Sequence, residues 1–84
     1  MVKASKLYEK LLQSGGRNLA FRDLERLLRA FGFTLDRTVG SHRQYVHPLV
    51  PRPFPVQPER KDAKPYQVRQ FLDIVEQFGL SIDE

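Results

Sequence analysis

Apolar residues recur with helical periodicity in three separate stretches of the chain. A spacing of three and four residues places such side chains along one face of a helix, which can then pack against a core. The three stretches are Ala4–Ser14, Phe21–Phe31 and Pro65–Phe78. Each is followed by a glycine (Gly15, Gly32 and Gly79), and glycine readily takes the left-handed backbone conformation that ends a helix. The pattern therefore predicts three amphipathic helices.

Between the second and third helices the periodicity changes from helical to alternating. Alternation of apolar and polar residues is typical of a half-buried strand, and prolines restrict a strand to the edge of a sheet. The strands expected from this pattern are Phe33–Thr38, Ser41–His47 and a short Phe54–Gln57. Val39-Gly40 is expected to form the first turn, and so short a connection makes the first two strands antiparallel. We interpret Leu49–Pro53 and Glu59–Lys64 as loops, because they are rich in proline or in charge.

Together these elements predict an α+β protein with the element order α-α-β-β-β-α. Each amphipathic helix has to bury its apolar side, so we expect a small three-stranded antiparallel sheet covered by helices, mainly on one face. With 84 residues, the chain is expected to form a single domain, 1–84. A domain of this size buries only about 60–65% of its unfolded surface, so its core is thin.

The chain is basic, and positive charge gathers in its middle. The formal net charge is +4 and the isoelectric point of the sequence is about 9.8. Between positions 37 and 69, seven basic residues stand against two acidic ones. Such a distribution favours a surface that binds a polyanion such as nucleic acid, and ordinary solubilising charge is the alternative interpretation.

Several classes of site are not expected from this composition. The sequence has no cysteine, and no apolar run approaches the roughly 18 residues that span a bilayer. We therefore expect no disulfide, no thiolate metal site and no association with a membrane. Met1–Lys10 lacks the apolar stretch of a signal peptide, which favours a cytoplasmic location. The acidic residues and the two histidines are not spaced as ligands, so neither a metal nor a cofactor is expected.

The main candidate for chemistry is His42, which closes the tripeptide Gly40-Ser41-His42. Imidazole titrates near neutral pH, which suits it to proton transfer. His47 is five residues further on, and an odd separation along a strand directs the two rings to opposite faces. Ser41 would also point away from His42, which argues against a serine–histidine relay.

A single histidine among arginines suits cleavage of RNA by the substrate's own 2′-hydroxyl. Because the RNA supplies the nucleophile, the protein has only to move protons and to neutralise the charge that develops on the phosphate. DNA lacks the attacking hydroxyl and would not be cut. The candidate RNA contacts are Gly40, Ser41, Arg43, Lys61 and Lys64. The simpler interpretation is that His42 is a surface histidine without a function, because an isolated residue carries little weight.

Three blocks of the sequence resemble the HicA family of toxin–antitoxin toxins. They are Phe21-Arg22-Asp23-Leu24 through Phe31-Gly32-Phe33, then Gly40-Ser41-His42 with Tyr45 and His47-Pro48, and finally Ala63-Lys64-Pro65-Tyr66-Gln67-Val68-Arg69-Gln70. The blocks span roughly Phe21 to Leu80 and stand in matching order. The tripeptide by itself would be a poor signal. Its position after a helix and a strand, with the third block downstream, makes the resemblance more specific.

The resemblance implies a fold similar to that of double-stranded-RNA-binding domains. It also implies ribosome-independent mRNA cleavage and neutralisation by a HicB-like antitoxin protein. The histidine of the Gly-Ser-His motif is the catalytic residue of that family, and this role carries over to His42. The expected partners are then mRNA and the antitoxin, without contact to DNA by the toxin alone. Residues 21–80 would be the family core, and 1–16 an added helix with its glycine stop.

Two features depart from the family pattern. Many members carry a basic residue before the motif glycine, where this chain has Val39, and the change would alter phosphate contacts. Many members also begin near the second helix, so the segment Lys6–Gln13 is an addition to the core or to the antitoxin interface. Two other hypotheses remain open: a non-catalytic RNA-binding module of the same architecture, and an interaction protein whose basic face docks an acidic partner.

Overall fold

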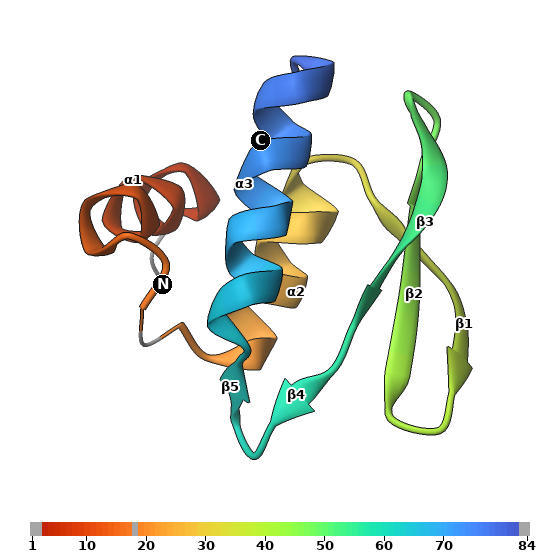
Figure 1. Cartoon of the computed structure of the whole chain (residues 1–84). Coiled ribbons are helices and arrows are strands. Elements are labelled where there is room, and N and C mark those ends of the chain that lie inside the picture. The colour runs from red at the N-terminus through yellow and green to blue at the C-terminus, as the bar shows by residue number, and fades with distance from the viewer. Residues whose placement is uncertain (1–2, 18, 83–84) are drawn as a thin grey trace.

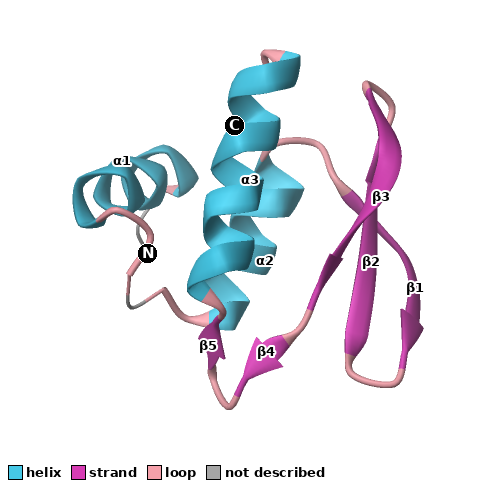
Figure 2. Cartoon of the chain, viewed as in Figure 1, coloured by secondary structure: helices cyan, strands magenta, loops and turns pink. Residues whose placement is uncertain are grey.

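The computed structural model describes residues 3–17 and 19–82, and Figure 1 and Figure 2 show how their helices and strands are arranged. The helices are α1 (Ala4–Ser14), α2 (Phe21–Ala30) and α3 (Pro65–Phe78). The strands are β1 (Thr34–Val39), β2 (His42–His47), β3 (Val50–Val56), β4 (Pro58–Glu59) and β5 (Asp62–Ala63). The predicted α+β class and the order α-α-β-β-β-α are confirmed, with β4 and β5 added as a short hairpin before α3. None of the helices in the described ranges is long and apolar enough to cross a membrane.

The helices and the three-stranded sheet form layers (Figure 1). Helices α2 and α3 lie between the sheet on one side and α1 on the other. The ring of Tyr8 in α1 meets Phe31 edge-on, with centroids 5.0 Å apart, and Phe31 lies 5.5 Å from Phe71 of α3. Helix α1 thus buries its apolar side against the other two helices, and α2 and α3 alone cover the sheet. An amphipathic helix needs only an apolar partner, and here that partner is another helix.

The core forms where the helix stripes meet the inner face of the sheet. Leu24, Leu27 and Leu28 of α2 are fully buried, as their spacing predicted. They pack in one cluster with Val68 and Phe71 of α3 and with Tyr45, Phe54 and Val56 of the sheet. Burying an apolar side chain of this size stabilises the fold by about 1.5–3 kcal/mol. The sheet is therefore held to the helices on one face only, and its other face is left to solvent.

A two-residue turn joins β1 to β2. Val39 pairs with His42 across the hairpin, which leaves Gly40 and Ser41 as the turn. Gly40 has a φ of 60°, and a glycine in this region at the first central position is typical of a type II′ turn. The turn lies one residue later than predicted, because β1 extends to Val39 and uses it in the ladder.

Strand β3 is longer than the sequence predicted. It covers Val50–Val56, so the expectation of a loop over Leu49–Pro53 was wrong for most of that segment. The strand order β1-β2-β3 places β3 at an edge, where proline can be tolerated because its missing N–H can face away from the neighbouring strand. On the side of β3 that faces away from β2, the carbonyl of Pro55 accepts a hydrogen bond from the side-chain amide of Gln67 in α3, at 3.4 Å. The outer edge of β3 is thus attached to α3.

The segment Glu59–Lys64, predicted to be a loop, contains the short hairpin β4–β5. Two backbone hydrogen bonds fix this hairpin to the beginning of α2. The N–H of Phe21 donates to the carbonyl of Lys61 at 2.9 Å, and the N–H of Ala63 donates to the carbonyl of Leu19 at 2.8 Å. These partners are at least 40 positions apart, so the local sequence carries no signal for the pairing.

Helix α2 ends as predicted, with the chain folding back at glycine. Gly32 has a φ of 96°, and the N–H of Phe33 donates to the carbonyl of Leu28 at 2.9 Å. This is the hydrogen bond of a Schellman motif, and it brings the ring of Phe33 into the core. A Cβ atom on Gly32 would lie 3.1 Å from Nε2 of His47, so the position also has little room for a side chain.

A buried carboxylate connects α2 to β2. Glu25 of α2 is 7% exposed, and it accepts hydrogen bonds from the Arg43 guanidinium and, at 2.5 Å, from the Tyr45 hydroxyl. Both donors come from β2 and lie two residues apart, so they point to the same face of the sheet. Burial and, next, the bond to Glu25 raise the pKa of Tyr45 to about 12. The pairing satisfies a charge that would otherwise be costly to bury.

The structure predicts that Gly32→Ala destabilises the protein by about 1–3 kcal/mol, because alanine is strained at positive φ and its Cβ would crowd His47. Gly79→Ala is the matched control: Gly79 also ends a helix at positive φ, at 61°, but a Cβ atom there would meet open space. Urea unfolding of both variants measures the difference. Equal losses at the two positions would show that the contact with His47 is unimportant.

Stability is expected to fall in alkaline solution because of Tyr45. Its pKa is raised in the folded state, so the stabilisation is fully present below the ordinary value of 10.0 and is lost as the pH rises through about 12. Urea unfolding at about pH 8 and about pH 11 measures this loss. Tyr45→Phe is expected to lower stability at the lower pH, because Glu25 loses a donor, and to make the decline with pH shallower. An unchanged decline in that variant would assign the pH dependence to other groups.

Candidate functional site

His42 is the first residue of β2, and its side chain is exposed to solvent. Tyr45 is fully buried under the helices, so alternation along β2 directs Arg43 and Tyr45 inward and His42 outward. The residue opposite His42 is Val39 of β1, which is 57% exposed. The imidazole therefore stands at an open position beside the turn formed by Gly40 and Ser41, both of which are exposed as well.

Arg43 lies on the other face, with its guanidinium held in place. It is bonded to Glu25, and its central carbon lies 5.2 Å from the centroid of the Phe21 ring, a cation–π distance. The side chain is still 41% exposed. Arg43 thus presents part of its guanidinium to solvent from a fixed position, while the rest neutralises a buried carboxylate.

Glu25 is a part of the site region that sequence reasoning missed. It lies four residues after Phe21 and three before Leu28, so the helical period places it at the border of the apolar stripe of α2. That position was a signal for partial burial. The pairing with Arg43 and Tyr45 joins residues 18 and 20 positions apart, which only the packing of α2 on β2 establishes.

Two of the predicted RNA contacts line one hollow, and a third does not. Arg43 and Lys61 both line a cavity of about 680 Å³ between the beginning of α2 and the β4–β5 hairpin. Arg22, Glu25 and Arg60 contribute further walls. Lys64 immediately precedes α3 as its half-buried N-cap residue and is not among the lining residues. Lys64 therefore does not contribute to this cavity.

His47 has a structural role. Its Nδ1 accepts a hydrogen bond from the N–H of Leu49 at 3.0 Å, so Nε2 carries the proton and donates it to the carbonyl of Phe31, also at 3.0 Å. Its ring also packs against Phe33, with centroids 5.0 Å apart. Both nitrogens are occupied, and the ring points to the face opposite His42, as the odd spacing predicted. Across residues 3–17 and 19–82, no three or more side chains of the ligating kinds are placed to hold a metal ion.

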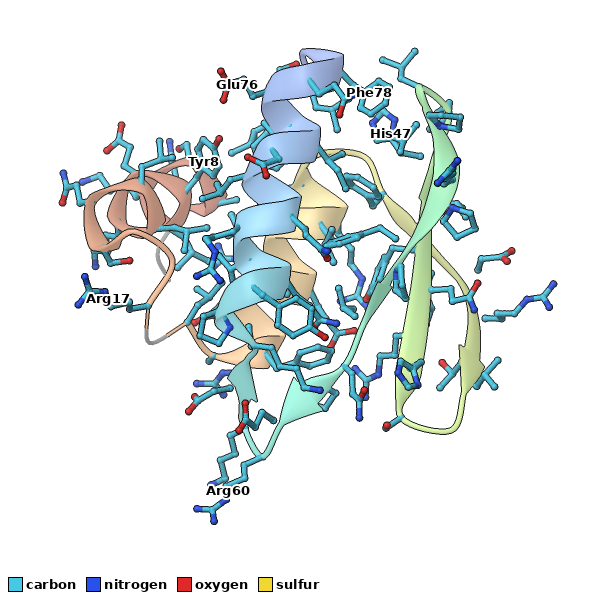
Figure 3. The ribbon with its side chains drawn as sticks, viewed as in Figure 1. Tyr8, Arg17, His47, Arg60, Glu76 and Phe78 are labelled. Atoms are coloured by element: carbon cyan, nitrogen blue, oxygen red, sulfur yellow. The ribbon has the colours of Figure 1, made fainter. Side chains whose placement is uncertain are left out.

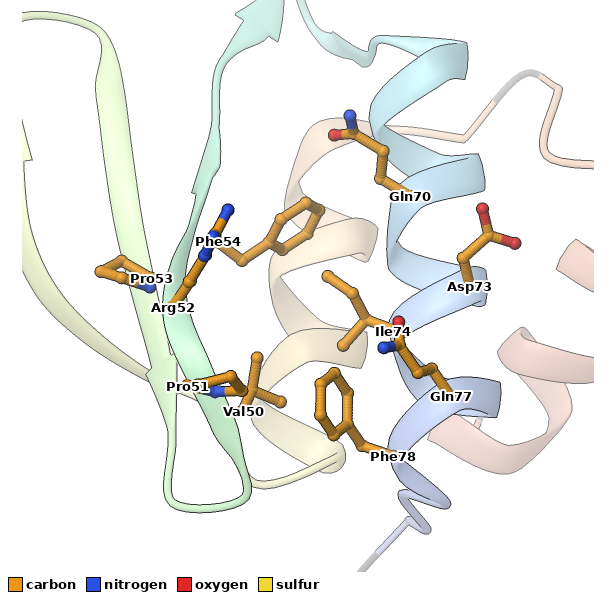
Figure 4. Close-up of a pocket in the computed structure, with 10 residues that line it drawn as sticks. All are labelled: Val50, Pro51, Arg52, Pro53, Phe54, Gln70, Asp73, Ile74, Gln77 and Phe78. Atoms are coloured by element: carbon orange, nitrogen blue, oxygen red, sulfur yellow. The ribbon is translucent and has the colours of Figure 1, made fainter.

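A second cavity, of about 510 Å³, lies between β3 and α3 (Figure 4). Its lining is mixed: Val50, Phe54, Ile74 and Phe78 are apolar, whereas Arg52, Gln70, Asp73 and Gln77 are polar. No histidine lines it, and its one cation is matched by one carboxylate. It therefore lacks both the proton-transfer group and the excess of positive charge that distinguish the region around His42.

Comparison with known proteins identifies one family. The model of the family described as HicA toxin of bacterial toxin–antitoxin matches residues 21–80, from the first residue of α2 to two residues beyond the end of α3. The match includes the turn with His42 and leaves α1 outside. Searches of curated proteins and of solved structures found no match. Since the family model covers well over half of the 84 residues, the chain belongs to the HicA toxin family of bacterial toxin–antitoxin systems.

Proposed function

We propose that this HicA toxin is a metal-independent, ribosome-independent mRNA endonuclease that acts in the cytoplasm with His42 as its catalytic histidine. Membership of the family supports a role as a toxin, and mRNA cleavage is the activity that the resemblance implies. The observation that carries the proposal is the position of His42. Its ring is exposed beside a tight turn, and a basic cavity lies on the other face of the same strand.

The reaction is transesterification within the RNA. The 2′-oxygen of a ribose attacks the adjacent phosphorus, and its proton passes to a base. The bond from phosphorus to the 5′-oxygen of the next nucleotide breaks, and that oxygen takes up a proton. The products are a 2′,3′-cyclic phosphate and a 5′-hydroxyl, and no oxidant or external nucleophile is needed. His42 performs one of the two proton transfers, to which a positioned group typically contributes about 10²–10⁴-fold in rate.

Positive charge near the scissile phosphate stabilises the dianionic phosphorane that the attack produces. Arg43 is the nearest arginine in sequence. Its side chain points to the opposite face of β2 from His42, and the exposed part of its guanidinium attracts the RNA strand from a fixed support. Gly40 and Ser41 form the exposed turn before His42, where backbone N–H groups can approach a phosphate closely because glycine has no side chain. Lys61 and Lys64 contribute to the attraction of the RNA strand from the segment before α3.

The first test is His42→Ala. Cleavage of single-stranded RNA in the presence of a chelator is expected to fall by at least about 10²-fold, because proton transfer is lost, while the thermal unfolding temperature and RNA binding are retained. Gln44→Ala, on the same outward face of β2, is the control and is expected to cleave RNA. End-group analysis should show the cyclic phosphate, and a DNA of the same sequence should remain intact.

Two outcomes would reject the proposal in different ways. Retained cleavage in His42→Ala would remove the catalytic role from this residue. Salt-sensitive RNA binding by the wild type without any product would instead support the alternative, a non-catalytic RNA-binding module of the same fold.

Neutralisation by a HicB-like antitoxin is expected to work by covering His42 and the basic residues around it, because RNA then has no access to the ring. Adding the antitoxin at equal concentration should abolish RNA cleavage. In the complex, the backbone N–H groups from Gly40 to Arg43 should be protected from hydrogen exchange, whereas those of exposed residues in α1 should exchange as in the free toxin. A complex that is inhibited but leaves His42 open would require inhibition by another route.

A further inference from the structure

Basic residues outnumber acidic ones in the lining of the cavity between α2 and the β4–β5 hairpin. Four basic side chains border it, Arg22, Arg43, Arg60 and Lys61, and we call it the basic hollow. Its acidic lining residues are Glu25 and Asp62. Because Glu25 is buried and bonded to Arg43 and Tyr45, its charge is already balanced within the protein. With Glu25 and Arg43 paired to each other, three basic residues of the hollow remain against one acidic residue, Asp62.

Three of these cations are available to a ligand. Arg22, Arg60 and Lys61 are exposed, and within the described part of the chain none of them forms a side-chain ion pair or hydrogen bond. Arg43 differs, since its bond to Glu25 and its place over the Phe21 ring fix it as a wall. The hollow thus combines one rigid guanidinium with three donors whose hydrogen bonds are still to be made.

One of the three, Arg22, stands at a position where a cation is otherwise unfavourable. Arg22 lies in the first turn of α2, where the positive end of the helix dipole repels it unless an anion is present. Arg60 has a φ of 59°, the one positive φ of a non-glycine residue within the described ranges, in a turn where glycine would be relaxed. Figure 3 shows Arg60 projecting from the tip of the β4–β5 turn. An anion in the hollow would offset the repulsion between Arg22 and the positive end of the helix dipole.

The hollow is linked to His42 by sequence, because the next residue lines it. Arg43, which forms its wall, directly follows His42 in the sequence, and Pro58 at the start of β4 also lines it. The side chains of His42 and Arg43 point to opposite faces of β2, so an RNA strand with its scissile phosphate at His42 would have to pass around the end of the sheet to enter the hollow. Single-stranded nucleic acid is typically held by such grooves of positive charge that follow its backbone.

We propose that the basic hollow binds a backbone phosphate of the RNA substrate, other than the one cleaved at His42, through Arg22, Arg60 and Lys61. This assignment rests on the proposed nuclease function for its biological meaning, but the binding itself can be measured without cleavage. Arg43, held by Glu25 and the Phe21 ring, forms a fixed wall of the hollow. The contacts are to phosphate, so they add affinity for RNA of any sequence.

The test measures binding of fluorescent single-stranded RNA in the His42→Ala background, so that no substrate is consumed. Arg60→Gly removes the guanidinium and relaxes the turn, and Lys61→Ala removes the neighbouring charge without changing the backbone carbonyl that binds Phe21. Each is expected to weaken RNA binding about tenfold, and to lower the slope of log affinity against log salt by about 0.7. Arg22→Ala is expected to act in the same direction.

Arg17→Gly and Lys10→Ala are the matched controls, because each removes the same kind of charge from an exposed position outside the hollow. Arg17 lies well away from Arg60 in Figure 3. The controls are expected to change RNA affinity less than twofold. In the protein that retains His42, Arg60→Gly should raise KM for RNA and leave kcat nearly unchanged. The reason is that the phosphate contact is equally strong in the enzyme–substrate complex and in the transition state.

The outcomes separate this proposal from the nuclease itself. If the hollow variants bind RNA no more weakly than the controls, the hollow is not an RNA site, whether or not His42→Ala abolishes cleavage. If those variants keep RNA affinity and instead lose affinity for the antitoxin, the hollow is a protein-docking surface and the proposal is wrong. If they lose RNA affinity although the wild type cuts nothing, the phosphate site stands and only the nuclease function fails.

Discussion

The pairing of the buried Glu25 carboxylate with Arg43 and Tyr45 is the interaction on which the geometry of the site depends. An ionised group with 7% exposure is costly to bury unless charged and hydrogen-bonding partners meet it, and Arg43 and Tyr45 do so together. Those two residues lie two positions apart on β2, so their side chains share one face. Their attachment to Glu25 decides that this face turns to the helices. A shift by one residue would reverse every side chain. Because Arg43 points toward the helices, its neighbour His42 points to the opposite face of the sheet.

Two further sets of hydrogen bonds attach the sheet and the β4–β5 hairpin to the helices. The β4–β5 hairpin is bonded to the beginning of α2, and Gln67 of α3 bonds both the carbonyl of Pro55 and the N–H of Gln57. Both attachments lie near the end of the sheet that carries His42. Helix α1 packs on the far side of the helix layer and lies outside the segment that the family model matches. It enlarges a thin core without contacting the sheet face where His42 stands.

Reasoning from sequence succeeded where the deciding contacts are local. The glycine stops at Gly32 and Gly79, the stripe of leucines on α2 and the opposite directions of His42 and His47 all follow from periods of 3.6 or 2 and from backbone sterics. It failed where proline was taken as a loop signal in β3. The edge position of that strand, which follows only from the sheet order, makes its prolines acceptable.

The sequence by itself determined the three helices, the order α-α-β-β-β-α, the thin core and the basic middle of this HicA toxin, because the periods and charges behind them can be read from neighbours within a few residues. Only the tertiary structure decided which charges act together. Glu25 meets Arg43 and Tyr45, and Lys61 lines the cavity at the beginning of α2 while Lys64 does not, through contacts between residues far apart in the chain. Electrostatic interactions depend on distance in space, and that distance is set when the helices pack on the sheet.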